Sequence, residues 1–146
     1  MAKTALWWTL AVIAGTVVGM AVLTGLLYAG GLLYPMPPGL DPSSSDAAQV
    51  AAMKAWLSTL PAGAFVLALA EHALGCAAGA AVAMLIGRRR SMGPAILVGV
   101  LFTIAGVMNL REIPHPSWFG FIDLPLYLIA AVTVARLLVR PRAVAA

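Results

Sequence analysis

Two ionisable residues, Glu71 and His72, stand inside a long apolar segment of this chain. A carboxylate at the depth of a bilayer costs at least ~3 kcal/mol on insertion scales, so we expect it to have a partner and to face protein or water. Membrane-embedded carboxylates and imidazoles often relay protons or bind solutes. On a helical wheel the pair shares one broad face with Gly75 and Gly79, which other helices can approach closely.

Further polar residues fall at the ends of later apolar segments, at about the same depth as Glu71. Counting ~1.5 Å of rise per residue, we predict that seven side chains converge in one pocket in the outer half of the membrane. These binding or proton-linked candidates are Glu71, His72, Asn109, Arg111, His115, Asp123 and Tyr127. We expect Glu71 to hydrogen-bond across the bundle to Arg111, Asn109 or Tyr127, with its neighbour His72 as the poorer partner. Each of the seven also has a plain structural interpretation, as a packing, capping or loop-holding residue.

Three functions are compatible with such a pocket. The favoured one is binding or transport of a small solute or a proton. The first alternative is a metal-dependent membrane enzyme acting on a lipid or other hydrophobic substrate, because His, Asp and Glu are metal-ligand types. The second is a non-catalytic membrane partner or assembly factor. The spacing is unlike HExxH, and the sequence lacks a Gly-rich phosphate loop, a nucleophile elbow and Cys-x-x-Cys. No metal site, cofactor or catalytic residue is therefore assigned, and catalysis is the less favoured interpretation.

Composition places the chain in a membrane. The 146 residues are 62% hydrophobic and only 10% charged, with a net charge of +4, and the mean hydropathy is +0.99. A soluble domain has roughly a quarter charged residues. Lys and Arg gather at the ends of apolar segments, which is a topology pattern and a poor sign of nucleic-acid binding. The single Cys76 excludes an internal disulfide framework.

The apolar segments predict an all-α fold, a four-transmembrane-helix bundle in a single domain over 1–146. The expected spans are 6–33, 62–87, 92–110 and 121–139, and a short interfacial helix over 46–58 lies in the first outer loop, opened by a capping box of Asp46 and Gln49. Seven of the nine Lys and Arg residues fall on one side, which the positive-inside rule makes cytoplasmic, so both termini are predicted inside a bacterial inner membrane. These residues are Lys3, the arginines at 88–90, Arg136, Arg140 and Arg142.

Glycines mark where the helices approach one another. We expect helix packing at Gly15, Gly19, Gly75, Gly79, Gly99 and Gly106, because small residues let membrane helices come close. Pro125 is expected in the first turns of the fourth span. Four short helices enclose little volume, so a transport path favours a homo-oligomer within the lipid bilayer.

Several segments together resemble a group of small bacterial four-helix integral membrane proteins. The likeness rests on Tyr34-Pro-Met-Pro-Pro-Gly, the helix with Gly75 and Gly79, Asn109, and the outer loop Ile-Pro-His-Pro-Ser-Trp-Phe ending at Phe119. It covers nearly the whole chain, and the Ile-Pro-His-Pro-x-Trp segment is its most specific part. The group is uncharacterised, so the resemblance implies a fold and a bacterial membrane location but carries no chemistry.

Overall fold

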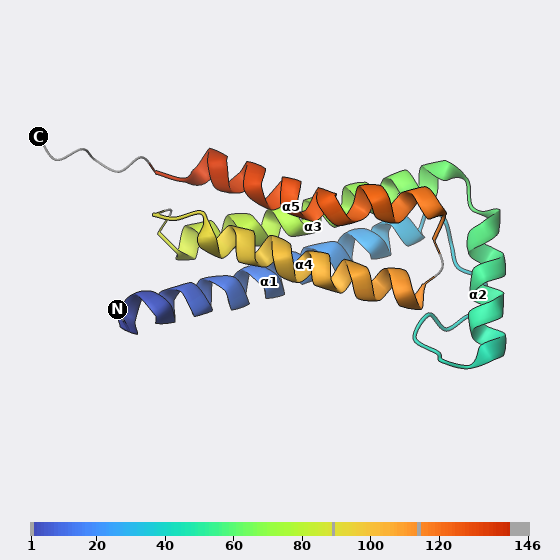
Figure 1. The fold of residues 1–146 in the computed structure, drawn as a ribbon. Coiled ribbons are helices and arrows are strands. Elements are labelled where there is room, and N and C mark those ends of the chain that lie inside the picture. Colours follow the sequence, from blue (N-terminus) through green and yellow to red (C-terminus); the bar gives the residue numbers. More distant parts are fainter. Residues whose placement is uncertain (1, 89, 114, 141–146) are drawn as a thin grey trace, which may run out of the picture.

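Five α-helices make up the part of the chain that the computed structural model describes, which is residues 2–88, 90–113 and 115–140, with side chains from residue 5. The helices are α1 (Ala2–Gly31), α2 (Ala47–Thr59), α3 (Ala62–Ile86), α4 (Gly93–Glu112) and α5 (Ser117–Leu138) (Figure 1). The predicted all-α class is therefore confirmed. Four of the helices are long and apolar enough to cross a membrane.

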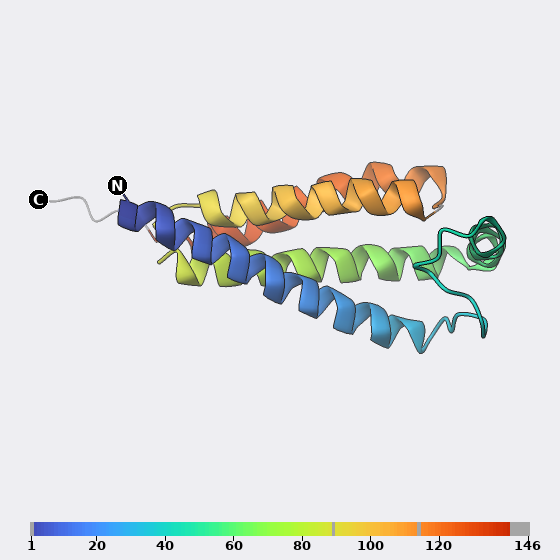
Figure 2. The ribbon, with the colours of Figure 1, turned by 90° about the horizontal axis from the view of Figure 1, so that it is seen from below.

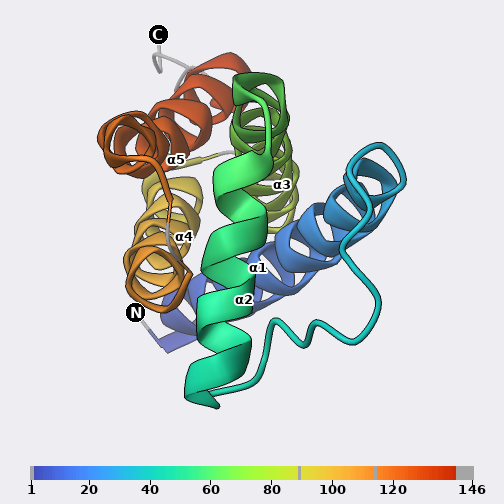
Figure 3. The same ribbon diagram turned by 90° about the vertical axis from the view of Figure 1, so that its right-hand side faces the viewer.

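The four long helices run alongside one another, and α2 lies across one end of them (Figures 1 and 3). The start of α1, the end of α5 and the α3–α4 connection are all at the opposite end (Figure 1). Helix α3 is central, since it packs on α1, α4 and α5. Helix α1 lies close to α4 near its start and separates from it toward α2 (Figure 2). This divergence leaves the space in which the candidate site lies.

The outside of the bundle is apolar along much of its length. Large side chains such as Val17, Phe121 and Leu137 are exposed, with Phe121 at 84% and Leu137 at 78%. A surface of this kind is characteristic of contact with lipid, because soluble monomers rarely present large contiguous apolar patches to water. Together with the lengths and hydropathies of the four helices, it suggests a multi-pass membrane protein.

Helices α1 and α3 meet through glycines on both sides. A Cβ added at Gly15 would lie 2.6 Å from the carbonyl oxygen of Gly79, and one at Gly19 would lie 2.8 Å from that of Gly75. The two backbones are thus in direct contact over one turn, which any larger side chain would prevent. Elsewhere Gly99 lies against Ala131 of α5 in the same manner.

The short helix begins as expected, but its capping differs from the prediction. The Asp46 carboxylate accepts hydrogen bonds from the backbone N–H groups of Ala48 and Gln49, which is N-capping. The reciprocal half of a capping box is absent from the described hydrogen bonds. Gln49 instead accepts from the backbone N–H of Asp41 and donates to the carbonyl of Gly39, because its side chain lies beside the preceding proline-rich loop. That loop is therefore fastened to α2.

Helix α5 begins earlier than the predicted span. It starts at Ser117 rather than at residue 121, directly after Pro116, whose extended backbone precedes the first turn. Pro125 is consequently inside the helix, beyond the first turns in which we expected it. The earlier start also makes Phe119 and Asp123 helical residues one turn apart, so that both project toward α3.

The glycine contact predicts opposite effects for the same substitution at two sites. Gly79→Ala places a methyl group against the α1 backbone, so we expect a loss of about 1–3 kcal/mol from overpacking. Gly25→Ala, whose added Cβ meets nothing within 4 Å, is the matched control and is expected to be neutral or to stabilise the helix by up to ~1 kcal/mol. Thermal unfolding in detergent measures both. Equal midpoints for the two variants would contradict the close approach.

Candidate functional site

The polar centre of the bundle joins α3 to α5. His72 Nδ1 lies 2.7 Å from Asp123 Oδ1 and 2.9 Å from the Tyr127 hydroxyl. Asp123 is fully buried, and His72 and Tyr127 are 6% and 3% exposed. Since Asp123 and Tyr127 are four residues apart on α5, they occupy adjacent turns of one face and meet the imidazole together.

The protonation pattern follows from the chemistry of these groups. A carboxylate only accepts hydrogen bonds, so Nδ1 of His72 is the donor to Asp123. Both contacts of the ring use Nδ1, which leaves Nε2 of the neutral imidazole as an acceptor. The second carboxylate oxygen, Oδ2, is buried without a hydrogen-bond partner among the described residues. Among the described residues, His72 is therefore the hydrogen-bond donor to the buried carboxylate of Asp123.

A second histidine is joined to this centre through aromatic rings. His115, in the α4–α5 connection, stacks on Phe119 with ring centroids 4.6 Å apart. Phe119 also meets the His72 ring edge-on, with ring centroids 6.1 Å apart. His115 Nδ1 donates to the carbonyl of Ile113 over 2.7 Å. Its Nε2 is thus also an acceptor when the ring is neutral. Burial lowers the pKa of His115, opposed by the bond to Ile113 and by the charge of Asp123, so the neutral form is favoured.

A cavity of about 400 Å³ lies beside this centre, beneath α2 and between α1, α3 and α4. Figure 3 shows α2 crossing the space between α4 and α1 at this end. The polar side chains on its wall are His72, Asn109, His115, Tyr127 and the indole of Trp56. The rest of the wall is apolar and comes from α1 (Met20, Leu23, Leu27), the loop (Met36, Pro42), α2 (Met53, Leu57), and α3, α4 and the α4–α5 connection (Ala68, Phe102, Ala105, Gly106, Ile113).

Glu71 does not belong to this centre. Its carboxylate lies against Gly30 of α1, and it is 6% exposed. The predicted hydrogen bond to Arg111, Asn109 or Tyr127 is wrong, since no described hydrogen bond or ion pair joins Glu71 to any of them. One helical step of ~100° separates Glu71 from His72, and this step directs Glu71 to α1 and His72 to α5. The neighbour we ranked as the poorer partner is the one at the polar centre.

The other candidates divide between the cavity and the surface. Asn109 is half-buried and lines the cavity. Arg111 is exposed in the last turn of α4 and does not line the cavity. Four of the seven predicted residues, His72, Asn109, His115 and Tyr127, thus line one cavity, with Asp123 directly behind His72.

Several contributors were not singled out from the sequence. Phe119, at the end of the outer-loop segment that carries the resemblance, is fully buried between the two histidines. Met53 of α2 is also buried, and with Leu57 it closes the cavity. The helical spacing of Met53 and Leu57 in the sequence indicates an apolar face, but it does not tell whether that face meets lipid or protein.

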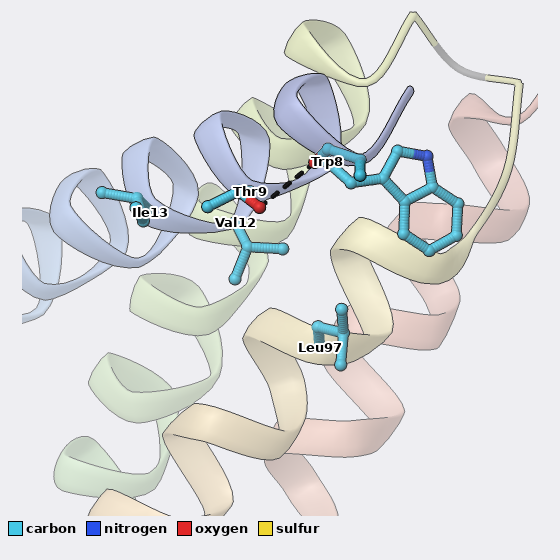
Figure 4. Close-up of a pocket in the computed structure, with 6 residues that line it drawn as sticks. Trp8, Thr9, Val12, Ile13 and Leu97 are labelled. Atoms are coloured by element: carbon cyan, nitrogen blue, oxygen red, sulfur yellow. Dashed lines mark hydrogen bonds between the residues drawn. The ribbon is translucent and has the colours of Figure 1, made fainter. Parts of the chain in front are cut away.

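A second hollow, of about 440 Å³, lies at the far end between α1 and α4. Trp8 and Val12 of α1 lie on the side of Leu97 of α4, and Ile13 also lines the hollow (Figure 4). The Thr9 hydroxyl donates to the carbonyl of Ala5 within its own helix (Figure 4). Among the described residues that line this hollow, the polar side chains are the Trp8 indole and Thr9, and the Thr9 hydroxyl is satisfied within its own helix. The rest of the described lining is apolar.

Metal ligation has little support in the described geometry. No three side chains of His, Cys, Asp or Glu among the described residues gather closely enough to hold an ion. The buried Cys76 thiol donates to the carbonyl of Tyr127 over 3.3 Å, so it is a helix-packing group. The alternative of a metal-dependent enzyme therefore lacks a ligand set in this part of the chain.

Comparisons with protein-family models, with curated proteins and with solved structures found no match to the chain. Function therefore has to be argued from the site itself.

The buried pair predicts a strong coupling between His72 and Asp123. His72→Phe keeps a ring between Phe119 and Tyr127 but leaves the carboxylate unpaired, which we expect to cost about 3–5 kcal/mol of folding free energy. Adding Asp123→Asn removes the charge, so the double variant should regain at least half of that loss. Reversible unfolding of the single and double variants in mixed micelles gives the coupling energy. Strictly additive losses would contradict the pairing.

The burial of His115 predicts that the folded protein loses stability in acid. Because burial lowers the pKa of His115 below the ordinary value of 6.5, the folded state binds a proton less readily than the unfolded state. Its contribution to stability is complete above about pH 6.5 and is lost as the pH falls from there through the lowered pKa. Comparing the unfolding midpoint of the parent with that of His115→Phe between pH 7.5 and 5 isolates this contribution. The parent should lose more stability than the variant, and parallel curves would contradict the burial effect.

Proposed function

We propose that this chain is a membrane-embedded protein that binds a small molecule in the cavity beneath α2, with His72 as its polar anchor and as a group that exchanges a proton with it. The observation that carries the proposal is the pairing of His72 Nδ1 with the buried Asp123 while the same imidazole lines the cavity. A histidine that served only to align two helices would not require a cavity beside its ring.

The arrangement supports proton exchange at Nε2. Asp123 fixes the ring so that the unprotonated nitrogen is available at the wall, and its carboxylate stabilises the imidazolium that forms when Nε2 accepts a proton. The Tyr127 hydroxyl at 2.9 Å provides a neighbouring group that holds the ring in place. A bound molecule that donates a hydrogen bond to Nε2 is thereby oriented, and its proton has an acceptor.

We further propose that the four long helices cross a bacterial inner membrane and that α2 lies along its outer surface. Arg88, Arg90, Arg136 and Arg140 lie at or near the end of the bundle opposite α2, which supports a cytoplasmic position for that end. Of the other basic residues used in this assignment, Arg89, Arg142 and the side chain of Lys3 lie outside the described residues. Transport across the membrane would need a homo-oligomer, since one bundle holds the cavity near one end only.

Filling the cavity is the direct test of binding. Ala105 lines the cavity on α4 and is exposed, so Ala105→Phe places a ring at the edge of the cavity without replacing either residue of the His72–Asp123 pair. We expect native mass spectrometry to find a small-molecule adduct on the gently purified parent protein and at least a tenfold lower adduct fraction on Ala105→Phe.

The matched control is Ala21→Phe, which adds the same ring to an exposed position of α1 that does not line the cavity. It should retain the adduct. Each variant should change the free energy of unfolding by no more than about 0.5 kcal/mol, which is the usual effect of a surface substitution. An adduct that persists on Ala105→Phe would show that the cavity is not the binding site.

A further inference from the structure

A smaller hollow of about 250 Å³ lies beside the cavity, between α2, the start of α3 and the α4–α5 connection. Its described lining is Lys54, Leu57 and Ser58 of α2, Phe65 of α3, and His115 and Pro116 of the connection. Figure 3 shows this connection beside the second half of α2, on the side away from α1. Lys54 and Ser58 are exposed, so the hollow opens at the end of the bundle that we propose to face the outside.

Two side chains separate this hollow from the cavity. Leu57 and His115 line both spaces, so a single layer of side chains lies between them. The backbone of α2 stays apart from the backbones of the other described helices, and α2 is held on the bundle by side chains such as Met53 and Leu57. Because side chains change rotamer much faster than helices move, joining the two spaces needs only a movement of Leu57 or of the His115 ring.

The other border of the cavity is apolar. Met20 and Leu27 line it from α1 and are 41% and 43% exposed, and the exposed Ala105 lines it from α4. In a membrane the acyl chains cover this border, so a charged or strongly hydrated solute is excluded from it by the cost of losing its hydration. The hollow beside α2 instead presents the Lys54 ammonium and the His115 imidazole to such a solute.

We infer that a small water-soluble solute enters the cavity from the outer aqueous side, through this hollow and between Leu57 and His115, and that Lys54 makes the entrance favour anions over cations. Lys54 is the only Lys, Arg, Asp or Glu among the described residues that line the hollow. The acidic residues Asp41 and Glu112 line a separate space of only about 20 Å³. This inference rests on the proposed binding role of the cavity and the proposed outer position of α2, and it adds the route of entry and a residue that selects solutes by charge.

Thiol labelling of the full chain in lipid nanodiscs tests the route. The reporter is Ala68→Cys, which lines the cavity, in a chain that also carries Cys76→Ala. The probes are 2-sulfonatoethyl methanethiosulfonate, an anion, and its trimethylammonium analogue, a cation. The matched control is Val66→Cys, which is 58% exposed on the same helix, is nearer to the start of α3 and lines neither space. We expect the anion to label Ala68→Cys at least about tenfold faster than Val66→Cys, since only the former has a route through water.

Variants of the partition assign the route to Leu57 and His115. Leu57→Trp should slow labelling of Ala68→Cys by the anion about tenfold, as a raised barrier to entry, whereas Leu57→Ala and His115→Ala should each speed it. Neutral methyl methanethiosulfonate, which dissolves in the bilayer, shows whether the new ring merely covers the reporter. Its rate with Leu57→Trp should be nearly unchanged. Ala52→Trp, exposed on α2 and lining neither space, should change neither rate.

Lys54→Gln tests the selection by charge with the same reporter. Removing one charge at roughly 8 Å from a passing ion should lower the anion-to-cation ratio of labelling rates about fourfold at low salt and about twofold at physiological salt. Lys54→Glu should lower the ratio by the same factor once more. A ratio that Lys54→Glu leaves unchanged at low salt would overturn the role of Lys54.

The outcomes separate the route from the binding role itself. Loss of the native adduct on Ala105→Phe, together with equal labelling of Ala68→Cys and Val66→Cys, would keep the cavity as a binding site and overturn entry through the hollow. Fast labelling by the anion that persists with Leu57→Trp would overturn the passage between Leu57 and His115.

Discussion

The charge of Asp123 is the constraint on which the site depends. A carboxylate at the centre of an apolar bundle is costly unless a hydrogen-bond donor meets it, and breaking such a pair costs more than the pair contributes to stability. His72 is that donor, at 2.7 Å, and it comes from α3, which, like α4, packs on all three other long helices. Holding the imidazole against α5 fixes the rotation of α3 about its axis. The same rotation turns Gly75 and Gly79 toward α1, so the polar pair and the glycine contact reinforce each other.

A buried hydrogen-bonded pair of this kind is weak evidence of function by itself, because it also specifies how two helices align. The cavity distinguishes the two roles here. An imidazole that only aligned α3 with α5 would be packed on its free edge by apolar side chains, as Cys76 is. His72 instead lines about 400 Å³ of space together with a second histidine whose Nδ1 is also engaged. Two imidazoles with matching tautomers on one wall present the same acceptor chemistry to whatever occupies the space.

Much of the architecture follows from composition and periodicity, because long apolar segments between proline-rich and arginine-rich connections leave few alternatives to a helical bundle. The seven polar residues were found by asking which of them share a depth, and depth follows from ~1.5 Å of rise per residue. Pairing does not. Glu71 and His72 have the same depth, and only the rotation of α3 relative to its neighbours decides which of them meets Asp123. That rotation is set by backbone contacts such as Gly15 with Gly79, whose partners no single-helix pattern specifies. The burial of Phe119 has a related cause: α5 begins four residues earlier than the predicted span, so Phe119 is a helical residue that lies against α3.

The cavity is itself a consequence of the glycine contact. A helix of 30 residues such as α1 is roughly 45 Å long at 1.5 Å per residue. When two straight helices touch backbone to backbone at one point and cross at an angle, they must separate on either side of it. Gly15 and Gly19 place that point in the middle of α1, where it meets α3, and α1 still lies against α3 at Gly30. The last third of α1 lies away from α4 (Figure 2). Side chains of α2 cover the resulting gap at the end, while its flank stays bordered by Met20 and Leu27. Close packing in the middle of the bundle and the cavity near its end are therefore adjacent, since Gly19 lies against Phe102 and Gly75 lies against Leu23, and both Phe102 and Leu23 line the cavity.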